Sequence, residues 1–182
     1  MTAAGGHVVS DRPDEAFREY VEERLPALQR LAYLLCQDRH HADDLVQEAL
    51  VKLYTKWDRA SAASHLHAYA RTTLVRTFLS ERRTNWARRV VLVDGFRDEP
   101  GISDPDAASI VAVRRALAEL PPRQRAVIAL RYYSDLSVEE TGETLGCSAG
   151  TVKSQTAKGL AALRRALPEV EPDDVPTTRT RS

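Results

Sequence analysis

Apolar residues recur at three- and four-residue steps through two long stretches of this chain, and the spacing constrains its fold more than any other feature. In the first stretch Phe17, Val21, Leu28 and Leu35 fall on one face of a helix. Pro26 interrupts that stretch and predicts a break there, because proline removes a backbone donor. No segment alternates apolar and polar residues for long enough to predict a β-strand. The pattern predicts an all-α fold.

Two further helices are expected in the first half. One begins near Ala42 and continues to Trp57. It carries Asp43 and Asp44 in its first turn, where acidic side chains suit the helix dipole. The next spans roughly residues 66–83.

An acidic segment then interrupts the helical pattern. Residues 94–108 hold five acids, two glycines and two prolines, a composition typical of a solvated linker. We therefore expect two small helical bundles joined by a flexible linker. The predicted parts are a domain at 13–90, a linker at 91–108, a domain at 109–167, and disordered tails at 1–12 and 168–182.

The charge balance excludes a uniformly basic binder, because 26 Lys and Arg face 26 Asp and Glu. No apolar run approaches the roughly 18 residues of a membrane span, and no secretory signal is visible, so a cytoplasmic location without membrane insertion is expected. Cys36 and Cys147 have no metal-type spacing. No phosphate loop or nucleophile constellation is present, so neither an enzyme nor a bound metal or cofactor is expected.

A helix-turn-helix is predicted near the C-terminus. Ser137 and Glu140 have the spacing of a capping box, and Gly146 can supply the positive φ that ends the helix. Ser148 can cap the next helix, which turns Val152 inward.

That second helix has the composition of a DNA reader. Between Ser148 and Leu167 there are four basic residues and no acid. Small residues on its outer face let a helix enter a major groove, where Lys153 can reach a base or a phosphate. A helical hairpin with a solvated basic face remains the alternative. The candidate DNA contacts are Ser148, Ala149, Gly150, Thr151, Lys153, Ser154, Ala157 and Lys158.

The third helix of the first half is also basic. Between Arg59 and Arg89 there are seven arginines and one acid, Glu81. Arginines neutralise phosphates, and interleaved aromatic rings can stack on unpaired bases. Phe78 is expected in the core, whereas Tyr69 and Trp86 fit the core and the surface equally. The candidate contacts are Tyr69, Arg71, Arg76, Arg82, Arg83 and Trp86.

The second helix carries an exposed acidic and polar stripe. We interpret it as a docking surface for a protein partner rather than a metal site, because no second acidic face matches it. The residues of this stripe are Asp43, Asp44, Gln47, Glu48 and Lys52.

In this order, the elements resemble a bacterial sigma factor of the extracytoplasmic-function class, in an actinobacterial-type subgroup. Residues 43–54 look like region 2.2, residues 120–132 like region 4.1, and residues 136–154 like region 4.2. The resemblance covers roughly residues 14–85 and 109–167.

The resemblance implies a transcription initiation factor. The stripe would bind the β′ clamp helices of core RNA polymerase, the third helix would melt and hold the −10 element, and the C-terminal domain would bind the −35 element and the β flap. An anti-sigma factor is a further possible partner. A decoy that binds an anti-sigma factor without initiating, and an enzyme with an appended helix-turn-helix, are the alternatives.

Four positions depart from the family pattern. Tyr69 replaces a tryptophan, Arg76 an asparagine, and Gln155 and Thr156 replace arginines. The sequence therefore does not predict which −10 base the protein would capture or which −35 sequence it would bind.

Overall fold

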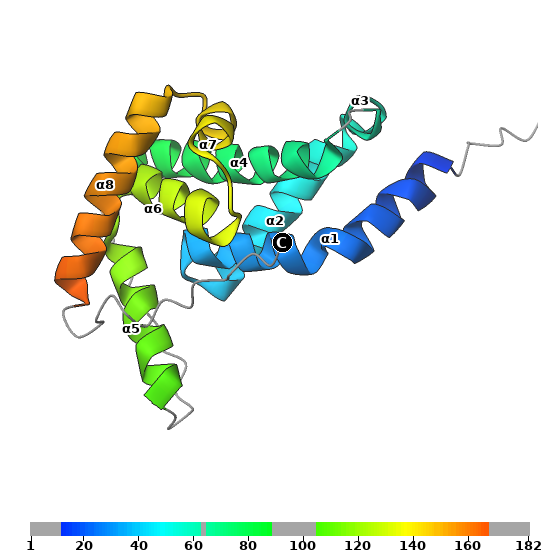
Figure 1. The fold of residues 1–182 in the computed structure, drawn as a ribbon. Coiled ribbons are helices and arrows are strands. Elements are labelled where there is room, and N and C mark those ends of the chain that lie inside the picture. The colour runs from blue at the N-terminus through cyan, green and yellow to red at the C-terminus, as the bar shows by residue number, and fades with distance from the viewer. Residues whose placement is uncertain (1–11, 63–64, 89–104, 168–182) are drawn as a thin grey trace, which may run out of the picture.

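The computed structural model describes residues 12–62, 65–88 and 105–167. Every regular element within these ranges is a helix, which confirms the all-α prediction (Figure 1). The elements are α1 (Arg12–Cys36), α2 (Arg39–Tyr54), α3 (Trp57–Ser61), α4 (Leu66–Arg88), α5 (Pro105–Glu119), α6 (Pro122–Ile128), a π-helical turn (Ala129–Tyr133), α7 (Val138–Leu145) and α8 (Ala149–Ala166).

The break expected at Pro26 is wrong, because α1 continues through it to Cys36. A proline inside a helix costs about 3 kcal/mol. Leu25 and Leu28 pack into the same core on either side of it, and Pro26 itself is exposed. Burial of the flanking turns offsets the lost hydrogen bond.

The start and end predicted for the second helix also need correction. α2 begins at Arg39, and Asp38 caps it by accepting a hydrogen bond from the His41 amide at 2.7 Å. Asp43 and Asp44 therefore lie in the second turn rather than the first. The helix ends at Tyr54, so Trp57 belongs to α3.

Three breaks divide the helices of the second half, and the one at Gly146 is predicted from the sequence. Helices end before Pro121-Pro122, before the turn at Ser134-Asp135, and at Gly146. α5 begins at Pro105, inside the segment expected to be linker. Proline suits this first position, because its missing N–H would be unpaired there in any case.

The largest core runs through both halves of the chain. Leu31, Leu45 and Phe78 from α1, α2 and α4 form one side of it. Ala129 and Leu130 from the C-terminal half belong to the same cluster, and Leu130 is fully buried. The expectation that Phe78 is a core residue is confirmed. The two domains therefore pack against each other, a contact that the periodicity of the sequence does not reveal.

Candidate nucleic-acid interface

The caps that the sequence predicts hold the hairpin of α7 and α8. Ser137 Oγ accepts from the Glu140 amide at 3.0 Å, and Glu140 Oε2 accepts from the Ser137 amide at 2.7 Å. The hydrogen bond from the Ser137 amide to the Glu140 carboxylate holds the pKa of Glu140 below its usual value. Gly146 ends α7 with a φ of 65°, and Ser148 begins α8 by accepting from the Thr151 amide at 3.2 Å. The capping box and the glycine turn are confirmed.

Gly142 sets how closely α7 approaches the turn. A Cβ atom at this position would lie 2.7 Å from the backbone oxygen of Cys147 and 3.7 Å from Val152 Cγ2. Val152 is fully buried, as predicted. Gly142 is not among the residues predicted from the sequence; its only signal there is a glycine inside a helical pattern, which often marks close packing.

The outer face of α8 is open to solvent. Its predicted contacts are exposed except for Thr151, which is half-buried. Lys153 and Lys158 are the charged residues of this face, and α8 contains no acid. In Figure 1, α8 lies at the edge of the molecule, with this hairpin on the side away from α1. The small exposed side chains of this face of α8, its positive charge and its exposure to solvent therefore suit it to a DNA major groove.

Tyr69, the aromatic candidate of α4 whose side chain the structure describes, is less available. The Tyr69 ring is half-buried and packs on a cluster of Leu53, Trp57, Ala60 and Ala70. This favours the core interpretation of Tyr69. Arg82, Arg83 and Trp86 belong to the last turns of α4, and their side chains lie outside those that the structure describes.

The two described arginines of α4 face α7. Arg76 is exposed, yet its Nε donates to the Thr144 carbonyl at 3.2 Å and its Nη2 to the Glu143 carbonyl at 3.3 Å. Arg71 is half-buried; burial lowers its pKa, and the nearby Glu140 carboxylate partly opposes that shift. The part of α4 that carries Arg71 and Arg76 thus lies beside the C-terminal domain.

The stripe on α2 lies on the surface as predicted, with all five of its residues exposed. Lys52 Nζ donates to Glu48 Oε1 at 2.5 Å and to Thr77 Oγ1 at 3.2 Å, which ties α2 to α4. The hydrogen bond from Lys52 holds the pKa of Glu48 below its usual value. The stripe is therefore charged, and its Lys52 end is held against α4.

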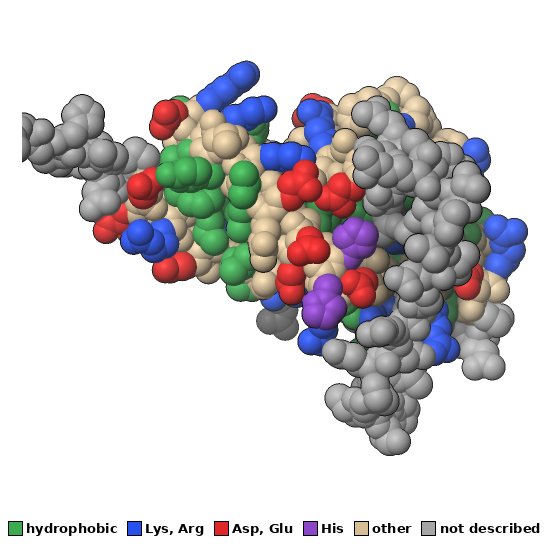
Figure 2. Space-filling model, turned by 180° about the vertical axis from the view of Figure 1, so that it is seen from behind, with side chains coloured by type: hydrophobic (Ala, Val, Ile, Leu, Met, Phe, Trp, Pro, Cys, Tyr) green, Lys and Arg blue, Asp and Glu red, His purple; other side chains and the backbone are tan. Residues whose placement is uncertain are grey.

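Two apolar residues beside the stripe were missed. Val51 is 63% exposed and Tyr54 is 48% exposed, at neighbouring positions of α2. The Tyr54 hydroxyl donates to Asp14 Oδ1 at 2.5 Å, which raises the pKa of Tyr54. Figure 2 shows acidic side chains gathered next to an apolar group on the face seen from behind. An anchor of apolar residues with a charged rim is typical of protein interfaces.

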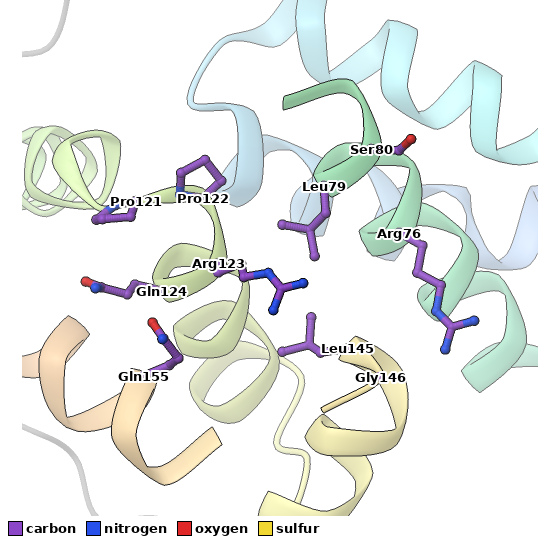
Figure 3. A pocket seen from close by; sticks show the side chains of 10 residues that line it. All are labelled: Arg76, Leu79, Ser80, Pro121, Pro122, Arg123, Gln124, Leu145, Gly146 and Gln155. Atoms are coloured by element: carbon purple, nitrogen blue, oxygen red, sulfur yellow. The ribbon is translucent and has the colours of Figure 1, made fainter. Parts of the chain in front are cut away.

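A cavity of about 800 Å³ lies beside Arg76, where α4 meets the C-terminal domain. Its lining residues are Arg76, Leu79, Ser80, Pro121, Pro122, Arg123, Gln124, Leu145, Gly146 and Gln155. Figure 3 shows Leu79 and Leu145 turned toward it from α4 and α7. The contact between the domains is thus incomplete at this end, which leaves the Arg76 guanidinium reachable from solvent.

The described part of the chain contains no group of three His, Cys, Asp or Glu side chains that could hold a metal ion. Of the helices within the described ranges, none combines the length and the hydropathy needed to cross a membrane. The candidate binding features in this part of the molecule are charged surfaces and a helix-turn-helix.

Both halves of the chain match known family models. Residues 20–88 match sigma-70 region 2, and residues 110–163 match sigma-70, region 4. The chain is 38% identical over 159 residues to the RNA polymerase sigma-E factor of Streptomyces avermitilis, a match that covers 83% of this chain and 84% of the relative. It is 32% identical over 158 residues to the ECF RNA polymerase sigma factor SigL of Mycobacterium tuberculosis, covering 84% and 89%.

Two solved structures have similar folds. The sigma factor RpoE of Bartonella quintana, solved in complex with the anti-sigma factor NepR, has a TM-score of 0.72 and 27% identity, covering 86% of this chain and 99% of that chain. CnrH, solved in complex with the cytosolic domain of CnrY, has a TM-score of 0.61 at 20% identity, covering 87% and 91%. The second likeness concerns the fold alone.

Proposed function

Because the chain belongs to the extracytoplasmic-function class of RNA polymerase sigma factors, we propose how its surfaces divide the work of promoter-specific transcription initiation. The α2 stripe, with Val51 and Tyr54, binds the β′ clamp helices of core polymerase. The basic face of α4 holds the melted −10 strand. The exposed face of α8 enters the major groove of the −35 element, and the C-terminal domain contacts the β flap. All of this takes place in the cytoplasm.

The observation that carries this proposal is the outer face of α8. A capped helix without acidic residues presents Gly150, Lys153 and Ser154 to solvent, and Val152 anchors its inner side. Small side chains permit close approach to base edges, and lysine supplies charge for a phosphate or hydrogen bonds for a guanine. Decoy and enzyme functions do not require this face.

We also propose that an anti-sigma factor binds the chain. The support is the Bartonella quintana relative, which was solved with such a partner and covers 86% of this chain. We expect that adding such an anti-sigma factor to the purified chain prevents the chain from binding core polymerase.

The DNA assignment is tested with Lys153→Ala. The variant should lose protection of the −35 region in footprints of the polymerase complex, because one base contact is worth about 1–3 kcal/mol. Lys56→Ala is the matched control, since it removes the same charge from an exposed site near α3. An unchanged footprint in Lys153→Ala would mean that α8 is not the reading helix.

A further inference from the structure

A second cavity, of about 380 Å³, lies between α1, the first half of α4 and the end of the π-helical turn. Its volume falls within the range of pockets that bind small molecules, which is about 300–1,000 Å³. The apolar residues that line it are Ala27, Leu28 and Leu31 of α1. The polar residues that line it are Arg30, His67, Arg71, Tyr133 and Ser134. The cavity thus combines an apolar wall with arginine, histidine and hydroxyl groups that can donate hydrogen bonds.

Two of these polar side chains have a buried nitrogen atom without a hydrogen-bond partner among the described residues. These atoms are His67 Nδ1 and Arg71 Nε, one turn apart on α4. The hydroxyl of Tyr20 on α1, which interacts electrostatically with Arg71, is a third such atom. Buried polar groups nearly always have a partner, and each exception calls for an explanation such as a bound water or ion. Three exceptions therefore occur together at this end of α4.

The carboxylates that act on His67 and Arg71 are engaged with other groups. Glu23 pairs with Arg24, with 3.0 Å between Oε1 and Nη2. Glu140 accepts the capping hydrogen bond at the start of α7. Burial, followed by repulsion from Arg24 and Arg71, lowers the pKa of His67. The positive charge beside the cavity is therefore not balanced by an ion pair with either carboxylate.

We propose that this cavity binds a small phosphate monoester, whose phosphate group accepts hydrogen bonds from Arg71 and His67 while its organic part packs on the apolar wall of α1. A guanidinium group can donate two parallel hydrogen bonds to a phosphate, and such charge-assisted hydrogen bonds are among the strongest in proteins. Arg30 is exposed at the same cavity, and its charge attracts an anion. His67 and Arg71 are half-buried, which favours a small molecule over a DNA strand. The site goes beyond the proposed function and does not depend on it.

Isothermal titration calorimetry of the full chain with phenyl phosphate, a phosphate monoester with a flat apolar body, tests the site. We expect saturable binding at one site per chain, about tenfold tighter than that of inorganic phosphate, because the ring buries apolar surface. Arg71→Gln should weaken the binding about tenfold or more, because a hydrogen bond to a charged group is lost. Arg164→Gln removes an exposed arginine of α8 that does not line the cavity, and this control should leave the affinity unchanged.

The contribution of His67 is tested by changing the pH. An anion beside the imidazole favours its charged form, so the pKa of His67 should rise when the site is occupied. Inorganic sulfate keeps both negative charges between about pH 7.5 and about pH 5.5, and it should bind about tenfold tighter at the lower pH. His67→Gln should remove this pH dependence, because glutamate and arginine side chains ordinarily titrate outside this range. The charged residues around the imidazole and the cavity are Glu23, Arg24, Arg30, Arg71 and Glu140.

Absence of phenyl phosphate binding at millimolar concentrations overturns the proposal, and so does binding that Arg71→Gln leaves intact. A pH dependence of sulfate binding that His67→Gln retains also contradicts it. If phenyl phosphate fails to displace a single-stranded oligonucleotide of unrelated sequence whose binding needs both His67 and Arg71, the site binds DNA backbone instead. Should circular dichroism show that Arg71→Gln has lost helix, Arg30→Gln replaces it, because Arg30 is exposed, and weaker binding is again the expected result. Transcription is not a readout, so failure of the proposed function would not alter these results.

Discussion

Two glycines of the helix-turn-helix differ in what surrounds them. Gly142 faces the Cys147 backbone oxygen at a distance too short for a Cβ atom, whereas around Gly150 the nearest atom, Ser148 Oγ, would be 3.9 Å away. Both lie in helices, where alanine is preferred over glycine by about 1 kcal/mol. Their substitutions should therefore act in opposite directions.

We expect Gly142→Ala to lower the free energy of unfolding by about 1–3 kcal/mol, because backbone must move to admit the methyl group. Gly150→Ala should raise it by up to about 1 kcal/mol. Urea unfolding followed by circular dichroism measures both. Equal effects of the two variants would show that the close approach at Gly142 does not constrain the fold.

His67 links stability to pH. Burial, aided by the nearby charges of Arg24 and Arg71, lowers the pKa of this imidazole in the folded protein. The unfolded chain then binds the proton more readily, so this contribution is fully present above the unfolded pKa of about 6.5 and is lost as the pH falls from there through the lower pKa of the folded protein.

Between about pH 7.5 and about pH 5.5 the unaltered protein should therefore lose more stability than His67→Gln. Denaturant unfolding at both pH values measures the difference. His65→Gln, at an exposed position two residues away, is the control and should behave like the unaltered protein. An identical pH response of His67→Gln and the unaltered chain would contradict the burial argument.

At the level of elements, the features that were predicted correctly are those that depend on neighbouring residues in the sequence. The capping box of α7, the glycine that ends it and the inward Val152 all depend on residues within a few positions of each other. The start of α2 was misplaced because Asp38 was not recognised as its cap. The helix through Pro26 was missed because tertiary burial overrides a local breaker, and no local pattern reports it.

The α2 stripe should act as a unit in binding core polymerase. We expect Asp44→Lys to weaken that binding about tenfold, because a reversed charge at a complementary interface replaces attraction by repulsion. Glu19→Lys makes the same change at an exposed position of α1. Fluorescence titration with core polymerase measures both, and equal affinities would remove α2 from the interface.

At the level of the whole molecule, the packing of the two domains could not be predicted from the sequence. Arg76 was assigned to nucleic acid because it is a cation on a basic helix, yet its partners are carbonyls 67 and 68 residues further along the chain. Arg125 was not singled out, although it joins the domains through the Leu35 carbonyl. Periodicity and charge identify faces, but they do not say which faces meet.

The central claim is that two DNA-contacting surfaces act together when core polymerase holds this chain. The most direct measurement adds the purified chain to core polymerase, together with genomic DNA, and maps the 5′ ends of the transcripts by sequencing. We expect start sites that are absent with core polymerase alone and are preceded by shared −10 and −35 sequences, and fewer such transcripts with Lys153→Ala. A chain that fails to bind core polymerase, or binds it without new start sites, would contradict the account.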